Sequence, residues 1–236
     1  MSEQSINDDT NDVPVEHRRR GLPLLATLLV VALVAGLITG IVVSRGDDSP
    51  PELTWTPIDG GLEETTLSVP VDHDVPGGDT LSLRVLRRPA DDPAQRIGSL
   101  LVNPGGPGFG TEMIIAQATE IFDTELLTGF DIVGMGPRGT GKSSPAIDCI
   151  DDYDALWAST DLTPDHDAAR NAQVATVAAY AQGCMERTGA AIAHMTTAAT
   201  ARDLDLLRRA LGEDTITYFG TSYGCELGAA WATAAC

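Results

Sequence analysis

A serine between two glycines has the clearest chemical potential in this chain. Ser222 stands in Gly220-Thr221-Ser222-Tyr223-Gly224, a G-x-S-x-G pattern that follows the apolar run 216–219. A sharp turn from a strand into a helix lifts such a serine clear of a sheet, and glycines are needed where a Cβ would collide with neighbouring backbone. The pattern therefore predicts an exposed, nucleophilic hydroxyl group at Ser222.

Two further glycine-rich segments, 103–108 and 136–143, each follow a short apolar run. Ligands bind at the carboxyl ends of the strands in an open α/β sheet, so the three segments are expected to line one crevice. The N–H groups of Gly106 and Tyr223 are candidates for an oxyanion hole, because glycine lets a substrate oxygen approach the backbone. The alternative for 103–108 is a tight turn that needs glycine only for its conformation.

Segment 136–143 also matches the phosphate-binding pattern G-x-x-x-x-G-K-[ST]. Such a loop must run directly into a helix, whereas Pro145 and several acidic residues follow here. We therefore expect a structural loop with an exposed Lys142. Nucleotide binding through this loop is kept as an alternative function.

A serine nucleophile needs a histidine that takes its proton and an acid that orients the histidine, and in α/β-hydrolases both follow the serine. All four histidines of the chain precede Ser222, namely His17, His73, His166 and His194, and Glu226 is the sole acid after it. His73, His166 and His194 are expected at the surface, although geometry rather than chain order defines a triad and His194 stays possible. We expect a chain truncated after the nucleophile and inactive by itself. A non-catalytic, membrane-anchored remnant is a second alternative.

The elements that must position the three loops can be read from the spacing of apolar residues. Segments 65–69 and 81–87 are predicted to form a hairpin, and 98–102, 130–135 and 215–219 further strands. Helices are expected over 112–127, from an N-cap at Thr197 to Gly212, and over 225–235. A helical face after residue 151 comprises Val174, Val177, Ala178, Ala181 and Met185. The alternation predicts an α/β fold, a mostly parallel sheet with helices on both faces.

The N-terminal region carries an uncharged, apolar stretch over residues 22–43. As a helix it would measure about 33 Å, enough to cross a bilayer. Arginines 18–20 precede it and Asp47 and Asp48 follow, which places the N-terminus in the cytoplasm. We expect a cytoplasmic tail at 1–20, a transmembrane signal anchor at 21–44, a linker at 45–52 and a hydrolase domain at 53–236. The protein would be single-pass in the cell membrane with an extracytoplasmic domain, or secreted if the anchor is cleaved.

The formal net charge of −19 argues against nucleic acid as a partner. The cysteines are Cys149, Cys184, Cys225 and Cys236, and no C-x-x-C or H-x-x-x-H spacing occurs, so neither a metal nor another cofactor is expected. Outside the membrane disulfides persist. The pair Cys149–Cys184 is preferred, because these residues flank a helical segment between two predicted strands.

Several segments together resemble one enzyme family. They are Trp-Thr-Pro at 55–57, Val-Pro-Val-Asp at 69–72, the glycine-rich stretch 98–108, the loop 137–143, Ala-Arg-Asp-Leu at 201–204 and the elbow 218–224. In this order they resemble actinobacterial tripeptidyl-aminopeptidase and proline-iminopeptidase-like α/β-hydrolases, over about residues 53–230. Gly136 and Cys225 depart from the family pattern, which usually has Asp and Thr there.

The resemblance implies a serine exopeptidase that releases short peptides or residues from a free amino terminus, either secreted or anchored to a membrane. It implies that Ser222 is the nucleophile and that Gly106 and Tyr223 line the oxyanion hole. It also implies a disulfide between Cys149 and Cys184. The expected substrates are peptides or small esters and amides.

Overall fold

A computed structural model of the chain describes residues 50–75, 77–215 and 217–234. Six strands form one sheet in the order β1-β2-β3-β5-β4-β6. The strands are β1 (Thr56–Ile58), β2 (Leu62–Pro70), β3 (Thr80–Arg88), β4 (Gly98–Asn103), β5 (Phe130–Met135) and β6 (Thr217–Gly220), with a short 3-10 turn, η1 (Asp59–Gly61), after β1. All five predicted strand segments therefore overlap with strands of the structure.

The sheet is mixed rather than mostly parallel, which corrects the prediction. The pairs β1–β2, β2–β3 and β3–β5 are antiparallel, whereas the pairs β4–β5 and β4–β6 are parallel. Strands joined by a short turn can only run antiparallel, and β2 and β3 form the predicted hairpin in which Leu67 lies opposite Leu83. The parallel strands β4, β5 and β6 are the ones that carry the three glycine-rich loops at their carboxyl ends.

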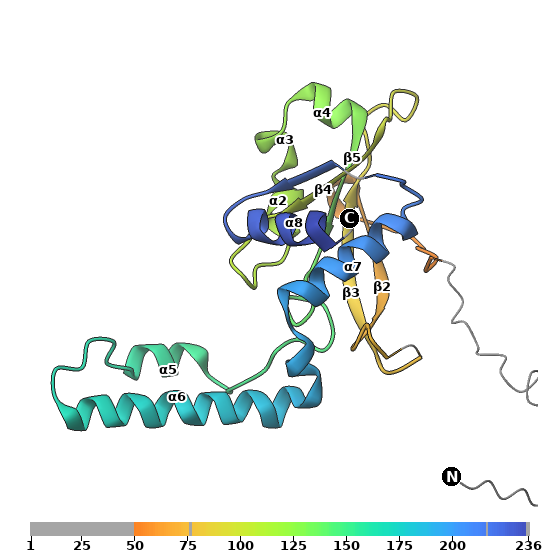
Figure 1. Cartoon of the computed structure of the whole chain (residues 1–236). Helices are drawn as coiled ribbons and strands as arrows, with labels where there is room; N and C mark the ends of the chain where they lie inside the picture. The colour runs from red at the N-terminus through yellow and green to blue at the C-terminus, as the bar shows by residue number, and fades with distance from the viewer. Residues whose placement is uncertain (1–49, 76, 216, 235–236) are drawn as a thin grey trace, which may run out of the picture. The chain divides into compact units, whose positions relative to one another are not determined.

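Helices cover both faces of the sheet, as predicted (Figure 1). Against one face lie α7 (Thr197–Ala210) and α8 (Tyr223–Ala234), which bury Leu204, Leu207 and Leu227 against the side chains of β2 and β3. Against the other lie α2 (Glu112–Ala116), α3 (Ala118–Ile121) and α4 (Thr124–Gly129), which replace the single helix predicted over 112–127. All six residues of β4 are buried, since this strand has apolar layers on both sides.

The helix before the elbow begins one residue earlier than predicted. The side chain of Thr196 accepts a hydrogen bond from the N–H of Ala199 at 3.1 Å, so Thr196 rather than Thr197 is the N-cap of α7. The helix is followed by Gly212, whose φ of 74° is the left-handed conformation that ends many helices.

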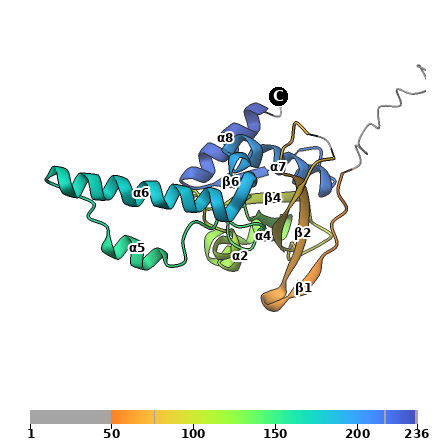
Figure 2. The ribbon, with the colours of Figure 1, turned by 90° about the horizontal axis from the view of Figure 1, so that it is seen from below.

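Two helices, α5 (Tyr153–Ser159) and α6 (Asp167–Thr188), lie side by side and extend away from the sheet (Figures 1 and 2). A 3-10 segment, η2 (Gly189–His194), leads back from α6 toward α7. The helical prediction for this region is confirmed, but its apolar face is not packed against the domain. Val174, Val177 and Met185 are 67%, 58% and 58% exposed, and Cys184 is the buried residue of α6.

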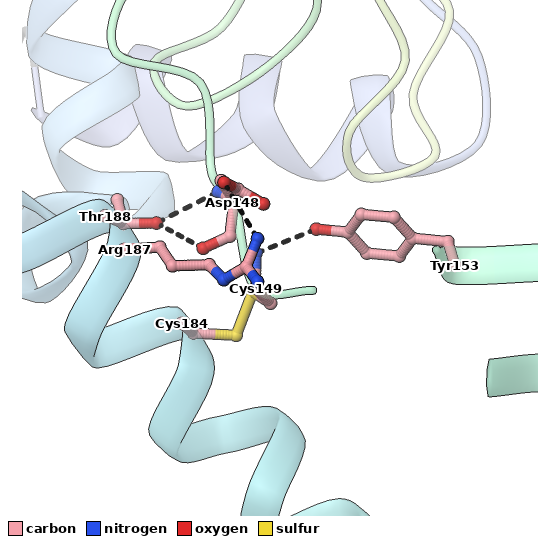
Figure 3. Close-up of a disulfide and its surroundings, with 6 residues drawn as sticks. All are labelled: Asp148, Cys149, Tyr153, Cys184, Arg187 and Thr188. Atoms are coloured by element: carbon pink, nitrogen blue, oxygen red, sulfur yellow. Dashed lines mark hydrogen bonds and ion pairs between the residues drawn. A yellow bond between two sulfur atoms is a disulfide. The ribbon is translucent and has the colours of Figure 1, made fainter. Parts of the chain in front are cut away.

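A disulfide joins Cys149 to Cys184, as predicted (Figure 3). It ties the segment before α5 to the last turns of α6. The hydroxyl of Thr188 accepts a hydrogen bond from the N–H of Asp148 and donates one to the carbonyl of the same residue, both at 3.0 Å. The hydroxyl of Tyr153 accepts a hydrogen bond from the N–H of Cys149 at 3.0 Å.

The predicted cytoplasmic tail, transmembrane anchor and the start of the linker, residues 1–49, lie outside the described residues. Of the helices in the part of the chain that the structure describes, none combines the length and the apolar composition of a membrane span.

Candidate active site

Ser222 occupies the turn between β6 and α8 and is exposed. Its φ of 53° lies in the left-handed region, which non-glycine residues adopt rarely and mostly at functional or strained sites. The N–H of Gly224 donates to the carbonyl of Thr221 at 2.8 Å and that of Cys225 to the carbonyl of Ser222 at 3.0 Å, so the chain bends directly into α8. The predicted geometry, an exposed serine on a sharp strand-to-helix turn, is what the structure has.

The flanking glycines allow this turn to press against the end of β4. A Cβ on Gly224 would lie 2.4 Å from the carbonyl oxygen of Asn103, and one on Gly220 would lie 2.6 Å from the carbonyl of Gly224. The hydroxyl of Tyr218 donates to that same carbonyl at 2.7 Å. Burial, together with the nearby Cys225 and Tyr223, raises the pKa of Tyr218 well above its ordinary value, so its hydroxyl stays a donor at neutral pH.

The loop after β4 lies directly against the elbow. The N–H of Thr221 donates to the carbonyl of Asn103 at 3.1 Å, and a Cβ on Gly105 would lie 2.6 Å from the carbonyl oxygen of Thr221 and 2.8 Å from the nitrogen of Tyr223. Gly105 therefore permits a contact between backbones that no side chain could allow. The structure thus brings Gly105, the residue before Gly106, against the elbow at Thr221 and Tyr223.

Two backbone donors at this place have no acceptor within the part of the chain that the structure describes. Among the described residues, neither the N–H of Gly106 nor that of Tyr223 donates a hydrogen bond to the protein. Tyr223 is the first residue of α8, and the first N–H groups of a helix have no acceptor within it. The positive end of the helix dipole adds to the attraction of these donors for a developing negative charge.

The three glycine-rich loops meet around one cavity of about 560 Å³. Four segments of the chain line it: Asn103, Gly105, Pro107 and Gly108; Pro137, Arg138, Thr140 and Ile147; Met195 to Thr197 with Thr200; and Tyr223 with Leu227. The predicted convergence of the loops is confirmed, and the volume is in the range of small-molecule sites. The start of α7 is a fourth wall that the glycine pattern did not reveal.

A buried ion pair holds two of these walls together. The side chains of Arg138 and Asp203 are both 0% exposed, and the guanidinium binds the carboxylate through two hydrogen bonds of 2.8 and 2.7 Å. The remaining donors of Arg138 reach the carbonyls of Pro70, Val71 and His194 at 2.8–3.1 Å. A bidentate pair with every donor used is the arrangement in which a buried charge is tolerated.

His73 joins this ion pair, which corrects the prediction that it lies at the surface. Its Nε2 is 2.7 Å from Oδ1 of Asp203 and 3.1 Å from the guanidinium of Arg138, and its side chain is 8% exposed. Sequence reasoning also missed Asp203. The spacing of Asp203 from Thr200 and Leu207 could have revealed its role, because it places the carboxylate on the same buried face of the helix. A buried carboxylate requires a cation nearby.

The loop that matches the phosphate-binding pattern is anchored to β3. The hydroxyl of Ser143 donates to the carbonyl of Gly136 at 2.8 Å and accepts from the N–H of Arg84 at 3.1 Å, while Lys142 is exposed as predicted. The next helix, α5, begins only at Tyr153. With its serine engaged and no helix at its end, the loop lacks the features that bind a phosphate.

His166 and His194, like His73, lie outside the cavity. His166 is exposed, and its Nδ1 accepts from the N–H of Ala169 at 2.9 Å to cap α6. His194 is half-buried at the end of η2. None of the histidines in the described ranges lines the cavity, and no group of His, Cys, Asp or Glu side chains in those ranges is placed to hold a metal ion.

The fold and the elbow define a hydrolase class. The sequence profile of the alpha/beta hydrolase fold family matches residues 98–235, and the chain belongs to this family. It is 37% identical over 231 residues to serine protease Hip1 of Mycobacterium tuberculosis (strain ATCC 25618 / H37Rv), an alignment that covers 90% of this chain and 44% of that protein.

The tripeptidyl aminopeptidase of Streptomyces lividans is 40% identical over 171 residues, 71% of this chain and 32% of that protein. Carboxylesterase B of M. tuberculosis is 47% identical over 148 residues, 61% of this chain and 28% of that protein. The predicted relationship to tripeptidyl aminopeptidases is thus confirmed. The chain spans less than half the length of these curated relatives.

Proposed function

We propose that Ser222 is the nucleophile of a serine hydrolase and that the N–H groups of Gly106 and Tyr223 hold the oxyanion. The observation that carries the proposal is an exposed serine in a left-handed turn, followed by the N–H of Tyr223 and packed against the loop that holds Gly106; neither N–H has an acceptor among the described residues. Oγ of Ser222 attacks the substrate carbonyl carbon, and the carbonyl electron pair moves to its oxygen. That oxygen accepts hydrogen bonds from the two amides. A base outside the described lining takes the hydroxyl proton and returns it to the leaving group as the intermediate collapses, and water then hydrolyses the acyl-serine.

The proton of Ser222 needs an acceptor, and no described histidine lines the cavity. A serine hydroxyl without an adjacent base is a weak nucleophile. We therefore expect the 236-residue chain alone to cleave tripeptidyl or aminoacyl reporters no faster than its Ser222→Ala variant.

For the substrate we propose peptides with a free amino terminus. The likeness to a tripeptidyl aminopeptidase and to a serine protease supports this class. A net charge of −19 also favours approach of a cationic amino terminus. Small esters are a second candidate, because the chain is 47% identical to a carboxylesterase over their shared region.

We also propose that the hydrolase domain works outside the cytoplasm, attached through the anchor predicted at 21–44 or secreted after its cleavage. The Cys149–Cys184 disulfide supports this location, since such bonds persist in oxidising compartments. Alkaline phosphatase fused after residue 52 should be active in cells, and inactive when fused after residue 15. Activity from both fusions, or from neither, would contradict the proposed orientation.

The nucleophile is tested by supplying the missing base. The chain is treated with p-nitrophenyl acetate in the presence and absence of imidazole, and acetylation of serine-containing peptides is followed by mass spectrometry. We expect imidazole-dependent acetylation of Ser222 that Ser222→Ala abolishes. Ser144 is also exposed but belongs to the loop anchored on β3, so it serves as the matched control. Acetylation of Ser222 no faster than that of Ser144 would overturn the proposal.

A further inference from the structure

The cavity beside the elbow is lined by polar side chains whose hydrogen bonds go to the protein itself. The hydroxyl of Thr140 donates to the carbonyl of Pro137 at 2.8 Å, and that of Thr200 donates to the carbonyl of Thr196 at 2.9 Å. The hydroxyl oxygen of Thr196 accepts the capping bond from Ala199. These hydrogen bonds orient the three hydroxyls, which stay uncharged and can still bind a neutral polar group.

The same holds on the side of the elbow. The hydroxyls of Thr197 and Tyr223 bind each other at 2.5 Å, and the side-chain carbonyl of Asn103 accepts from the N–H of Gly105 at 2.8 Å. Polar recognition in this cavity is then left to neutral groups, namely the lining hydroxyls, the side-chain amide of Asn103 and backbone groups such as the N–H of Tyr223.

The lining carries no available charge. Of the described residues that line the cavity, Arg138 is the one charged residue, and its guanidinium is fully buried against Asp203 and three carbonyls. No Asp, Glu, Lys or His belongs to this described lining. An ionic group entering the cavity would lose hydration without gaining a partner, which is strongly unfavourable.

One wall is apolar and is held in place. A Cβ on Gly139 would lie 2.9 Å from Cγ1 of Ile147 and 3.0 Å from Sδ of Met195, so these two side chains converge over the glycine. Arg138 donates to the carbonyl of His194, next to Met195, and so ties this wall to α7 through Asp203. A wall fixed by a buried ion pair is preformed, which lowers the ordering cost of binding.

We propose that this cavity binds an uncharged, apolar part of the substrate next to the carbonyl that Ser222 attacks, with Ile147 and Met195 as specificity-determining residues. The positively charged amino terminus of the substrate lies outside the cavity. This inference rests on the proposed function, because it places the cavity beside the attacked carbonyl. It narrows the substrate class to peptides with a neutral, aliphatic residue at that position.

Three tripeptidyl boronic acids test the proposal, identical except that the boronate residue corresponds to leucine, lysine or glutamate. Boron accepts the oxygen of a serine, whose proton passes to imidazole added as the base, and reproduces the tetrahedral intermediate, so binding can be measured by calorimetry without turnover. We expect the leucine-type probe to bind at least about tenfold more tightly than either charged probe, and Ser222→Ala to abolish the difference. Equal affinities, or tighter binding of a charged probe, would overturn the inference alone. Failure of all three probes to bind would overturn the proposed function together with the inference.

Two methionine variants test whether the wall formed by Ile147 and Met195 determines the preference among the probes. Met195→Lys should weaken the leucine-type probe about tenfold and strengthen the glutamate-type probe, because it places a cation in the wall. Met185→Lys is the matched control, since Met185 is 58% exposed on α6 and does not line the cavity. Thermal unfolding of each variant confirms that it folds. An unchanged probe ranking in a folded Met195→Lys variant would overturn the role of this wall.

Discussion

The elbow and the α5–α6 segment are held in place by different physical means. Around Ser222, backbone lies against backbone, and the side chains of the Arg138–Asp203 ion pair that joins two cavity walls are completely buried. In α5 and α6 the large apolar side chains are exposed, and a disulfide and surface ion pairs connect the segment to the chain before it.

The difference shows where precision is built into the molecule. Contacts between main-chain atoms leave almost no freedom in the direction of the elbow, as a nucleophile requires. Exposed ion pairs contribute little energy, so the position of α5 and α6 depends mainly on the disulfide and on the two hydrogen bonds between Thr188 and Asp148. The two regions should therefore respond in opposite ways to substitutions of buried charges and to reduction.

The largest effect is expected from Arg138→Met. It leaves the carboxylate of Asp203 buried without its cation, and such a change costs about 3–5 kcal/mol of unfolding free energy. Urea denaturation of the two proteins measures the loss. Arg187→Ala, which removes the exposed ion pairs of α6, should cost less than about 1 kcal/mol. Similar losses for the two variants would remove the distinction between the regions.

Reduction of the disulfide should act on α5 and α6 alone. The bond closes a segment with a sequence separation of 35, and its loss should favour local opening by about 2–4 kcal/mol. We expect Cys149→Ser/Cys184→Ser to speed proteolytic cleavage within 150–190 while hydrogen exchange in β4 and β5 stays unchanged. Faster exchange in those strands would show that the segment supports the sheet.

Gly105→Ala tests the contact between backbones at the elbow. The new Cβ would meet atoms of Thr221 and Tyr223, so we expect a loss of about 2–3 kcal/mol in thermal or urea unfolding. Gly212→Ala is the matched control, because Gly212 has a similar φ of 74° against 92° at Gly105. A Cβ at position 212 would lie in open space, so this variant should lose only about 1 kcal/mol of unfolding free energy. Equal costs would mean that φ alone, and not the elbow, requires glycine at position 105.

The smallest effect concerns pH. A hydrogen bond from Arg187 lowers the pKa of Asp151 below its ordinary value of 3.8. The interaction therefore supports the folded segment above about pH 4 and is lost as the pH falls through the lowered pKa. Carboxyl chemical shifts of Asp151, followed by NMR, should show this pKa return toward its ordinary value in Arg187→Gln. A pKa unaffected by that variant would contradict the assignment of the cause.

Local patterns predicted much of the fold and of the candidate site. The hairpin, the buried strands, the exposed serine and the Cys149–Cys184 pair follow from alternation, glycine placement and spacing. The antiparallel pairing of β3 with β5 and the division of 112–127 into three helices depend on which strands become neighbours, and no local pattern carries that information. In α6 the periodicity correctly predicted a helix with an apolar face. It could not tell whether another part of the protein covers that face, and in the structure the face is exposed.

The sequence by itself determined that a serine would stand on a tight turn between a strand and a helix, because backbone sterics at Gly220, Ser222 and Gly224 act over a few residues. Only the tertiary structure decided that His73, Arg138 and Asp203 meet, since they are separated by 65 residues or more in the pairs that contact. Burial of a charge is favourable only when its partner arrives from elsewhere in the fold, so the walls of the cavity became visible only after folding.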